Sequence, residues 1–200
     1  MKIEAGKQHD IPEIARLLTD AFFVDPVMKE YVAWSTDKRA ALAGFFTAEL
    51  ETFYLPRGVV DVVRGDDGLL GAALWATPER PMRRRDVVRQ LPALIRALGP
   101  SFPRALYLAS FDNAAAPAFT HWYLFTIVVS PQAQGHGIGG ALLDHGIERA
   151  GNNAIYLEST TAGSQRLYER KGFISLGRIP SPLPTSEVGM WRPGANSGNE

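Results

Sequence analysis

Apolar side chains recur along this chain at two different spacings. Over residues 11–22 and 42–53 they fall three or four positions apart, which predicts two amphipathic helices. Residues 59–63 and 69–76 are rich in β-branched and other apolar residues, and the Gly-Asp-Asp-Gly sequence between them predicts a hairpin. Helical and strand patterns therefore mix within one chain, which predicts an α/β fold with a mixed sheet.

The first predicted helix carries a signal for its own start. Asp10 directly precedes the apolar repeat and Glu13 follows three positions later, as in a capping box. A carboxylate at Asp10 can accept hydrogen bonds from the open N–H groups of the first turn. We therefore predict that Asp10 caps a helix beginning at Ile11.

The second half of the chain shows the clearest succession of elements. Residues 122–129 form a continuous apolar, aromatic and β-branched run, which predicts a central strand buried on both faces. Pro131 ends this strand, and a glycine-rich segment and a helix follow. Residues 154–158 predict another strand, and residues 165–171 predict a helix closed by Gly172.

The middle of the chain is less regular. Residues 87–98 have a helical pattern that contains Pro92, which should kink the helix or reset its start. We predict that residues 78–117 form a helical and loop insertion that covers the substrate site. Residues 1–192 are predicted to form a single domain, and residues 193–200 a disordered tail.

Composition narrows the class of protein. The 200 residues are 46% hydrophobic and 21% charged, which is typical of a globular protein. The 21 basic and 21 acidic side chains balance, which gives no support to binding of nucleic acid or of a membrane surface. The absence of cysteine excludes disulfides, thiolate metal sites and a cysteine nucleophile. Because the N-terminus is too polar for a signal peptide, we expect a cytoplasmic protein. We also expect that the protein binds no metal.

A glycine-rich segment joins the buried strand to the helix that follows it. Residues 134–140 read Gln-Gly-His-Gly-Ile-Gly-Gly. Glycine accepts positive φ angles and has no Cβ to obstruct an approaching anion. The free N–H groups at the start of a helix, together with the helix dipole, favour negative charge. The segment therefore predicts a turn that binds pyrophosphate.

Two pyrophosphate-binding motifs overlap in this segment. Gly135, Gly137 and Gly140 satisfy the G-x-G-x-x-G motif of dinucleotide-binding folds, and Glu158 lies near the distance expected of a ribose-binding acid. However, about two-thirds of the chain precedes the motif, and too little follows Glu158 to complete a doubly wound sheet. The competing pattern, Val-x-Pro-x-x-Gln-x-x-Gly-x-Gly over residues 129–139, fits the position of the segment better.

This second pattern resembles the acyl-CoA-binding motif of the GNAT acetyltransferase superfamily. Residues 155–159 and 167–173, Ile-Tyr-Leu-Glu-Ser and Leu-Tyr-Glu-Arg-Lys-Gly-Phe, are similar to the family's next strand and helix end. Residues 21–26, 73–79 and 122–127 resemble the puromycin N-acetyltransferase-like branch. The resemblance implies a central, mostly antiparallel sheet that is flanked by helices and splayed at a wedge for coenzyme A.

The resemblance also implies where acetyl-CoA binds. Pantetheine would pair with backbone groups that a bulge frees on the first wall of the wedge. The pyrophosphate would accept hydrogen bonds from the N–H groups of the glycine turn. Ser164 stands where many relatives have an asparagine that contacts the cofactor, and this difference weakens the expected contact at Ser164. The predicted cofactor-binding residues are Ile127, Val128, Val129, Gln134, Gly135, His136, Gly137, Ile138, Gly139, Gly140, Ser164 and Tyr168.

Two side chains are predicted to carry the chemistry. Tyr168 matches the family tyrosine beside the thioester sulfur, where it can donate a hydrogen bond or a proton to the leaving thiolate. An alkyl amine is mostly protonated at pH 7, so a base is expected. Glu158 ends the strand beside the wedge and is the predicted base, although a structural carboxylate fits that position equally well. His121 is a weaker candidate.

Residues near the N-terminus are predicted to bind the acceptor together with Glu158. Phe22 and Tyr31 are candidates for an apolar pocket, and Asp25 could attract a cation, although its place before Pro26 also suits a turn. We expect a monomer or homodimer that transfers an acetyl group from acetyl-CoA to a small-molecule amine by direct attack. A non-catalytic acyl-CoA sensor and a protein N-acetyltransferase are the alternatives.

Overall fold

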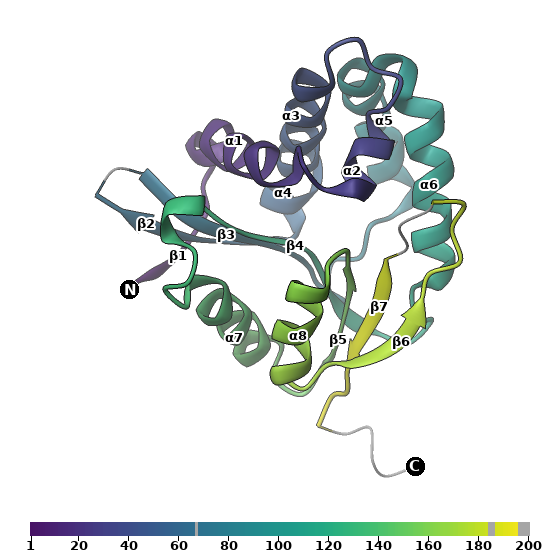
Figure 1. Cartoon of the computed structure of the whole chain (residues 1–200). Coiled ribbons are helices and arrows are strands. Elements are labelled where there is room, and N and C mark those ends of the chain that lie inside the picture. The colour runs from purple at the N-terminus through teal and green to yellow at the C-terminus, as the bar shows by residue number, and fades with distance from the viewer. Residues whose placement is uncertain (67, 184–186, 196–200) are drawn as a thin grey trace.

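A mixed sheet forms the centre of the molecule (Figure 1). The computed structural model describes residues 1–66, 68–183 and 187–195, and within them seven strands pair in the order β1-β2-β3-β4-β5-β7-β6. The strands are β1 (Ile3–Ala5), β2 (Val59–Gly65), β3 (Gly68–Ala76), β4 (His121–Val129), β5 (Ala154–Ser159), β6 (Ile174–Arg178) and β7 (Val188–Arg192). The β4–β5 pair is parallel and the other pairs are antiparallel, so the predicted mixed, mostly antiparallel sheet is confirmed. This order excludes the doubly wound parallel sheet of the dinucleotide alternative.

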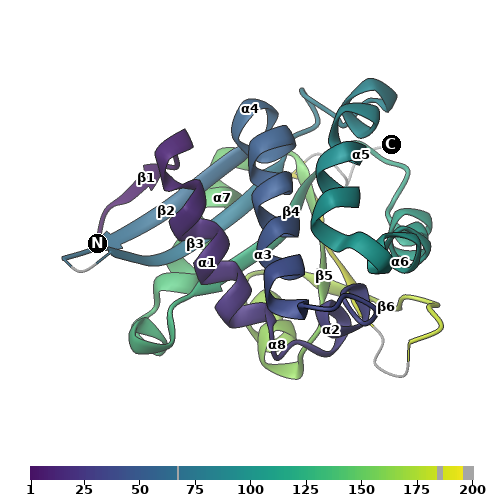
Figure 2. The ribbon, with the colours of Figure 1, turned by 90° about the horizontal axis from the view of Figure 1, so that it is seen from above.

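Helices cover both faces of the sheet. They are α1 (Ile11–Phe22), α2 (Pro26–Tyr31), α3 (Lys38–Glu49), α4 (Leu55–Arg57), α5 (Arg84–Leu98), α6 (Phe102–Ala115), α7 (Ile138–Ala150) and α8 (Ala162–Arg170). Helices α1, α3 and α5 lie beside one another on one side of the sheet (Figure 2), and α7 and α8 lie on the other (Figure 1). In the part of the chain that the structure describes, no helix has the length and apolarity needed to cross a membrane.

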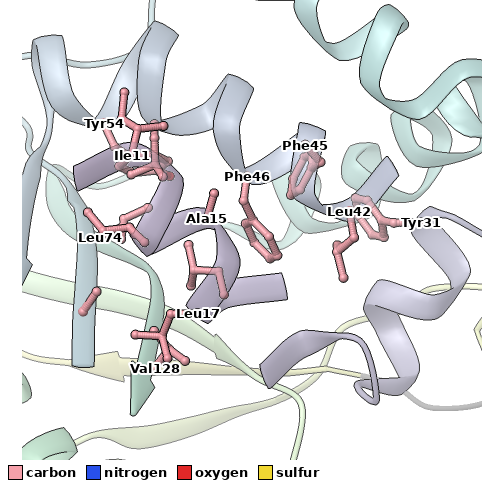
Figure 3. Packing of buried hydrophobic residues seen from close by; sticks show 14 of the residues in the cluster. Ile11, Ala15, Leu17, Tyr31, Leu42, Phe45, Phe46, Tyr54, Leu74 and Val128 are labelled. Carbon is pink, nitrogen blue, oxygen red and sulfur yellow. The ribbon is translucent and has the colours of Figure 1, made fainter. Parts of the chain in front are cut away.

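Each face of the sheet packs against its own hydrophobic core. Phe46 of α3 and Leu74 of β3 belong to the core under α1 and α3 (Figure 3). Trp75, the next residue of β3, belongs to the second core, together with Leu142 of α7 and Leu157 of β5. Successive side chains of a strand point to opposite faces, and burial on both faces therefore explains why the central strands have continuous apolar runs.

The start of α1 differs from the predicted capping box. One oxygen of Asp10 accepts a hydrogen bond from the N–H of Lys7 at 2.8 Å, and the other lies 2.7 Å from Nη2 of Arg64. Oε1 of Glu13 accepts from the N–H of Leu69 at 2.8 Å, which ties α1 to β3. A short 3₁₀ turn precedes the helix, so Asp10 already has helical backbone angles and its carboxylate closes that turn instead.

The irregular middle stretch folds largely as two helices. Helix α5 begins at Arg84 and continues through Pro92, so the proline does not reset its start. The carbonyl that would have bonded to the missing N–H belongs to Val88, which is 64% exposed and can be hydrated instead. Helix α6 follows α5 and ends at Ala115. Residues 196–200 of the predicted tail lie outside the described residues.

Candidate active site

Strand β4 loses one of its two partners partway along its length. Its pairing with β5 ends where Leu124 lies opposite Leu157, whereas its pairing with β3 continues to the end of the strand. A one-residue shift in the register with β3 leaves Phe125 in a β-bulge, which bends the strand. No strand among the described residues pairs with the β5-facing edge of residues 125–129. Nε2 of Gln134 donates to the Val129 carbonyl at 3.4 Å, and the remaining backbone groups of this edge are open to a ligand.

A cavity of about 800 Å³ opens where β4 and β5 separate. Strands β4 and β5 and helix α8 form one part of its lining, and helices α1, α2, α3, α5 and α6 form most of the rest. Of the residues predicted from the sequence, the lining includes Phe22, Asp25, Tyr31, Ile127, Val128, Val129, Gln134, Glu158, Ser164 and Tyr168. The lining does not include residues 135–140. The fold thus brings three separate stretches of sequence to one cavity.

The glycine turn leads from β4 into α7. Gly135 and Gly137 have φ angles of 81° and 79°, which side-chain-bearing residues rarely adopt. Gly137 is the N-cap of α7, and no described side chain caps this helix, so its first N–H groups are free to bind an anion. The side chain of Ile138 is buried in the core, and therefore only its backbone can face a ligand. The exposed His136 ring bonds to the carbonyl of Gln134.

Glu158 lies near the end of β5, directly after the last pair with β4. The hydroxyl of Tyr123 donates a hydrogen bond to Oε2 of Glu158 at 2.7 Å. Burial raises the pKa of Glu158 to about 7; the bond from Tyr123 opposes this rise, and the charge of Asp112 adds to it. A carboxyl group with this pKa can accept a proton near neutral pH.

Two carboxyl groups that sequence reasoning missed share the cavity with Glu158. Asp112 of α6 accepts a hydrogen bond from the hydroxyl of Tyr31 at 2.8 Å. Glu187 precedes β7, and burial together with the charges of Asp112 and Glu158 raises its pKa to about 9. No local motif marks these residues; only the pairing of β7 with β5 could have pointed to Glu187. Among the described residues, no three His, Asp or Glu side chains are placed to hold a metal ion.

Tyr168 of α8 lines the same cavity. Its ring packs against Phe173 with 5.8 Å between centroids, and only 6% of the residue is exposed. Burial raises the pKa of Tyr168, so its hydroxyl stays protonated and can donate at neutral pH. The hydroxyl of Ser164 bonds to Ser159 and to Thr161, the N-cap of α8. Ser164 is therefore part of a helix cap at the edge of the cavity.

Of the remaining predicted residues, some line the cavity and one does not. Asp25 is the N-cap of α2, where its Oδ1 accepts from the N–H groups of Val27 and Met28, and it also lines the cavity. Phe22 lies on the same part of the lining and packs against the core of α1 and α3. His121 lies at the start of β4 and does not belong to the cavity lining.

These features combine open backbone groups at a strand edge and a helix start with a cavity that holds a titratable carboxyl group, an arrangement that suits an enzyme. Residues 103–173 match a family model described as the acetyltransferase (GNAT) family. A Corynebacterium glutamicum protein described as histone acetyltransferase HPA2 and related acetyltransferase is 36% identical over 99% of this chain and 98% of that chain, with a TM-score of 0.78. The chain belongs to the GNAT acetyltransferase family and is an N-acetyltransferase.

A more distant structure shares the fold. An N-acetyltransferase from Staphylococcus aureus is 17% identical over 96% of this chain and 99% of that chain, and superposes with a TM-score of 0.62. At this identity the likeness concerns the arrangement of helices and strands alone. It shows that the sheet and its flanking helices persist when most side chains differ, whereas the acceptor follows from the side chains of the individual cavity.

Proposed function

We propose that this enzyme transfers the acetyl group of acetyl-CoA to the amine of a small molecule. The observation that carries the proposal is Glu158, a buried carboxyl group with a pKa of about 7 next to the point where β4 and β5 separate. It lines one cavity with Tyr168, whose hydroxyl is protonated at neutral pH. A base and an acid on one lining suit attack on a thioester.

The open edge of β4 and the glycine turn support acetyl-CoA as the donor. Pantetheine carries amide groups that can bond to the open edge of residues 127–129 as an added strand would. The pyrophosphate can accept from N–H groups of residues 134–140, where positive φ angles at Gly135 and Gly137 shape the turn. When bound, acetyl-CoA supplies the reactive thioester.

Each catalytic side chain has one task in this proposal. Glu158 accepts a proton from the attacking nitrogen, directly or through water, so that the nitrogen lone pair can form the new C–N bond. The Tyr168 hydroxyl donates to the sulfur as the C–S bond breaks. Tyr123 holds the Glu158 carboxylate through its 2.7 Å hydrogen bond. Asp112 adds negative charge that attracts an ammonium group before it loses its proton. Glu187, whose pKa is raised to about 9, is mostly protonated at neutral pH and offers a neutral carboxyl group to hydrogen bonding.

The lining of the cavity favours a small acceptor. Helices α5 and α6 both contribute to it, which agrees with the predicted role of residues 78–117 in covering the substrate site. Apolar side chains make up much of the lining, so the acceptor would combine a cationic nitrogen with an apolar body.

The test is release of free CoA by the purified protein, measured with a thiol reagent in the presence of acetyl-CoA. The amines would be a panel of small primary amines and a lysine-containing peptide. We expect release with small amines and little with the peptide. Release no higher than background with every amine would contradict the proposal, and release with the peptide alone would replace the small-molecule acceptor. Calorimetric titration with acetyl-CoA, NADH and ATP tests the donor separately.

A further inference from the structure

The cavity has a second polar end, between α3 and α5, that the proposed chemistry does not use. Glu49 is the last residue of α3, and Gln90 lies on α5, which packs against α3 (Figure 2). Both side chains line the cavity although they are only 9% and 4% exposed. A stretch of π-helix, residues 50–54, directly follows Glu49, and such stretches occur often at functional sites.

Glu49 is a buried acid without a cationic partner. Among the described residues no Lys, Arg or His side chain lies within ion-pair distance of it. Burial raises its pKa to about 7, and the nearby amide of Gln90 opposes that rise. A buried carboxylate is costly unless a positive charge or hydrogen-bond donors offset the loss of water. The protein itself does not supply that charge here.

Two further polar groups on the cavity lining lack a hydrogen bond of normal geometry to any described residue. Nε2 of Gln90 and Oγ1 of Thr126 are buried and make no hydrogen bond of normal geometry within the described part of the chain. Both residues line the cavity, and Thr126 is 8% exposed. Buried polar groups are nearly always satisfied, so unpaired ones on a cavity wall point to a ligand. A half-turn of the Gln90 amide presents its carbonyl oxygen instead, which can accept from an ammonium group.

Aromatic rings connect this end of the cavity to Glu158. Tyr123 donates the hydrogen bond to Glu158, and its ring centroid lies 6.5 Å from that of Phe125. The ring of Phe125 stacks on that of Tyr54, with 4.9 Å between centroids. Burial, together with the charges of Glu49 and Glu158, raises the pKa of Tyr54, so this ring lies within electrostatic range of both acids. All three rings line the cavity. An apolar wall therefore separates two acidic positions.

We propose that the acceptor is an elongated diamine: one nitrogen reacts at Glu158, an apolar spacer lies along the aromatic rings, and the second nitrogen binds as a cation at Glu49, Gln90 and Thr126. This inference rests on the proposed function, because it names the class of amine that the same site takes. The aromatic faces also favour a cation at either end of the spacer.

The first test compares straight-chain diamines with monoamines of the same length, in which a methyl group replaces the second nitrogen. Acetylation is followed by CoA release, and binding without turnover by calorimetry in the absence of acetyl-CoA. We expect at least one diamine to exceed its monoamine in kcat/KM and in affinity by about ten- to 100-fold, as for a charge-assisted hydrogen bond. Equal values across the whole series would overturn the inference.

The second test uses Glu49→Gln, which keeps the shape of the side chain and removes its charge. The preference for the diamine, expressed as the ratio of kcat/KM for the diamine to kcat/KM for its monoamine, should fall at least fivefold. Glu51→Gln is the matched control, because Glu51 follows two positions later, is exposed and does not belong to this cavity lining. A preference that survives in Glu49→Gln would contradict the role of Glu49.

Two further measurements keep these outcomes distinct. Gln90→Leu should also weaken diamine binding, and thermal unfolding of each variant shows whether it is folded. If no amine releases CoA but diamine binding still depends on Glu49, the proposed function fails and the subsite stands. If monoamines are acetylated as efficiently as the matching diamines, the proposed function stands and the subsite fails.

Discussion

The proposed donor-binding half and the proposed acceptor-binding half of the site are built in different ways. The donor half consists of backbone: the open edge of residues 125–129, the positive φ angles of Gly135 and Gly137, and the uncapped start of α7. The acceptor half consists of side chains from distant parts of the chain, such as Tyr31, Asp112 and Glu187. Only the donor half depends on a local sequence motif.

This difference predicts how each half responds to substitution. Because backbone groups form the donor half, its function should survive most side-chain changes and fail when the main chain is forced into another conformation. The acceptor half should behave in the opposite way, since single functional groups carry its chemistry. The experiments below test that distinction, beginning with the largest expected effect.

Removing the proposed base should have the largest effect on the rate. Glu158→Gln keeps the size of the side chain but cannot accept a proton, so we expect kcat to fall by about 10²- to 10⁴-fold. Affinity for acetyl-CoA, measured by calorimetry, should change little. Glu148→Gln serves as the control because Glu148 is exposed on α7, away from the cavity lining. A kcat within threefold of the unaltered enzyme would rule out Glu158 as the base.

Distortion of the glycine turn should abolish tight donor binding. Valine at Gly137 cannot readily adopt a φ of 79°, so the turn must shift its N–H groups away from the pyrophosphate. Loss of two hydrogen bonds to a charged group, each of about 1.5–3 kcal/mol, would weaken acetyl-CoA binding at least 100-fold. Calorimetry of the purified variant measures this loss.

Gly151→Val is the matched control for that experiment. Gly151 lies at the other end of α7, also has a positive φ angle, 58°, and has no atom within 4 Å of an added Cβ, as is true of Gly137. Both variants should lose thermal stability through the same backbone strain. If both lose affinity for acetyl-CoA equally, the effect is general destabilisation and the turn has no special role.

Tyr168 combines features of both halves, because it is proposed to lie near the bound donor but to act through its side chain. Tyr168→Phe removes a hydroxyl group that bonds to no described residue, so the fold should be as stable as before. We expect kcat to fall about ten- to 100-fold and the Kd of acetyl-CoA to stay within twofold. A parallel loss of affinity and rate would instead place Tyr168 among the donor-binding groups.

Local patterns explain how much of the fold could be predicted. The run at residues 122–129 lies in β4, where buried side chains alternate with half-buried ones, and Gly172 follows α8 with a positive φ angle of 85°. The capping prediction at Asp10 was wrong because the carboxylate closes the preceding 3₁₀ turn through the N–H of Lys7 and pairs with Arg64, from a distant strand. Local propensity is therefore reliable until a tertiary contact offers the side chain a better partner.

In the candidate site, too, residues within local motifs could be predicted and residues brought in by tertiary contacts could not. The glycine turn and Tyr168 lie in continuous motifs, so the sequence was sufficient to name them. Asp112, Glu187 and Glu49 lie in no motif, and each reaches the cavity only through helix packing or strand pairing. Their place depends on contacts between residues far apart in the chain, which periodicity and spacing do not encode.

The smallest effect concerns the pH dependence of the acceptor half. With the pKa of Glu158 at about 7, kcat/KM should fall as the pH drops below 7, because protonation removes the base. The hydrogen bond from Tyr123 favours the ionised carboxylate and so lowers this pKa. In Tyr123→Phe the pKa of Glu158 should rise, and the acidic limb of the profile should move to higher pH while the plateau at alkaline pH changes little.

A pH series of kcat/KM for the two proteins, each with saturating acetyl-CoA, measures that displacement. Because the substitution removes one hydroxyl from a ring that still packs beside Phe125, a general loss of structure would lower the plateau and leave the limb in place. A displacement toward higher pH with an unchanged plateau therefore identifies Glu158 as the titrating base. An unmoved limb, or one that moves to lower pH, would mean that the profile reports another group, and Glu187, a second buried carboxyl group of the same cavity, would be the next to replace.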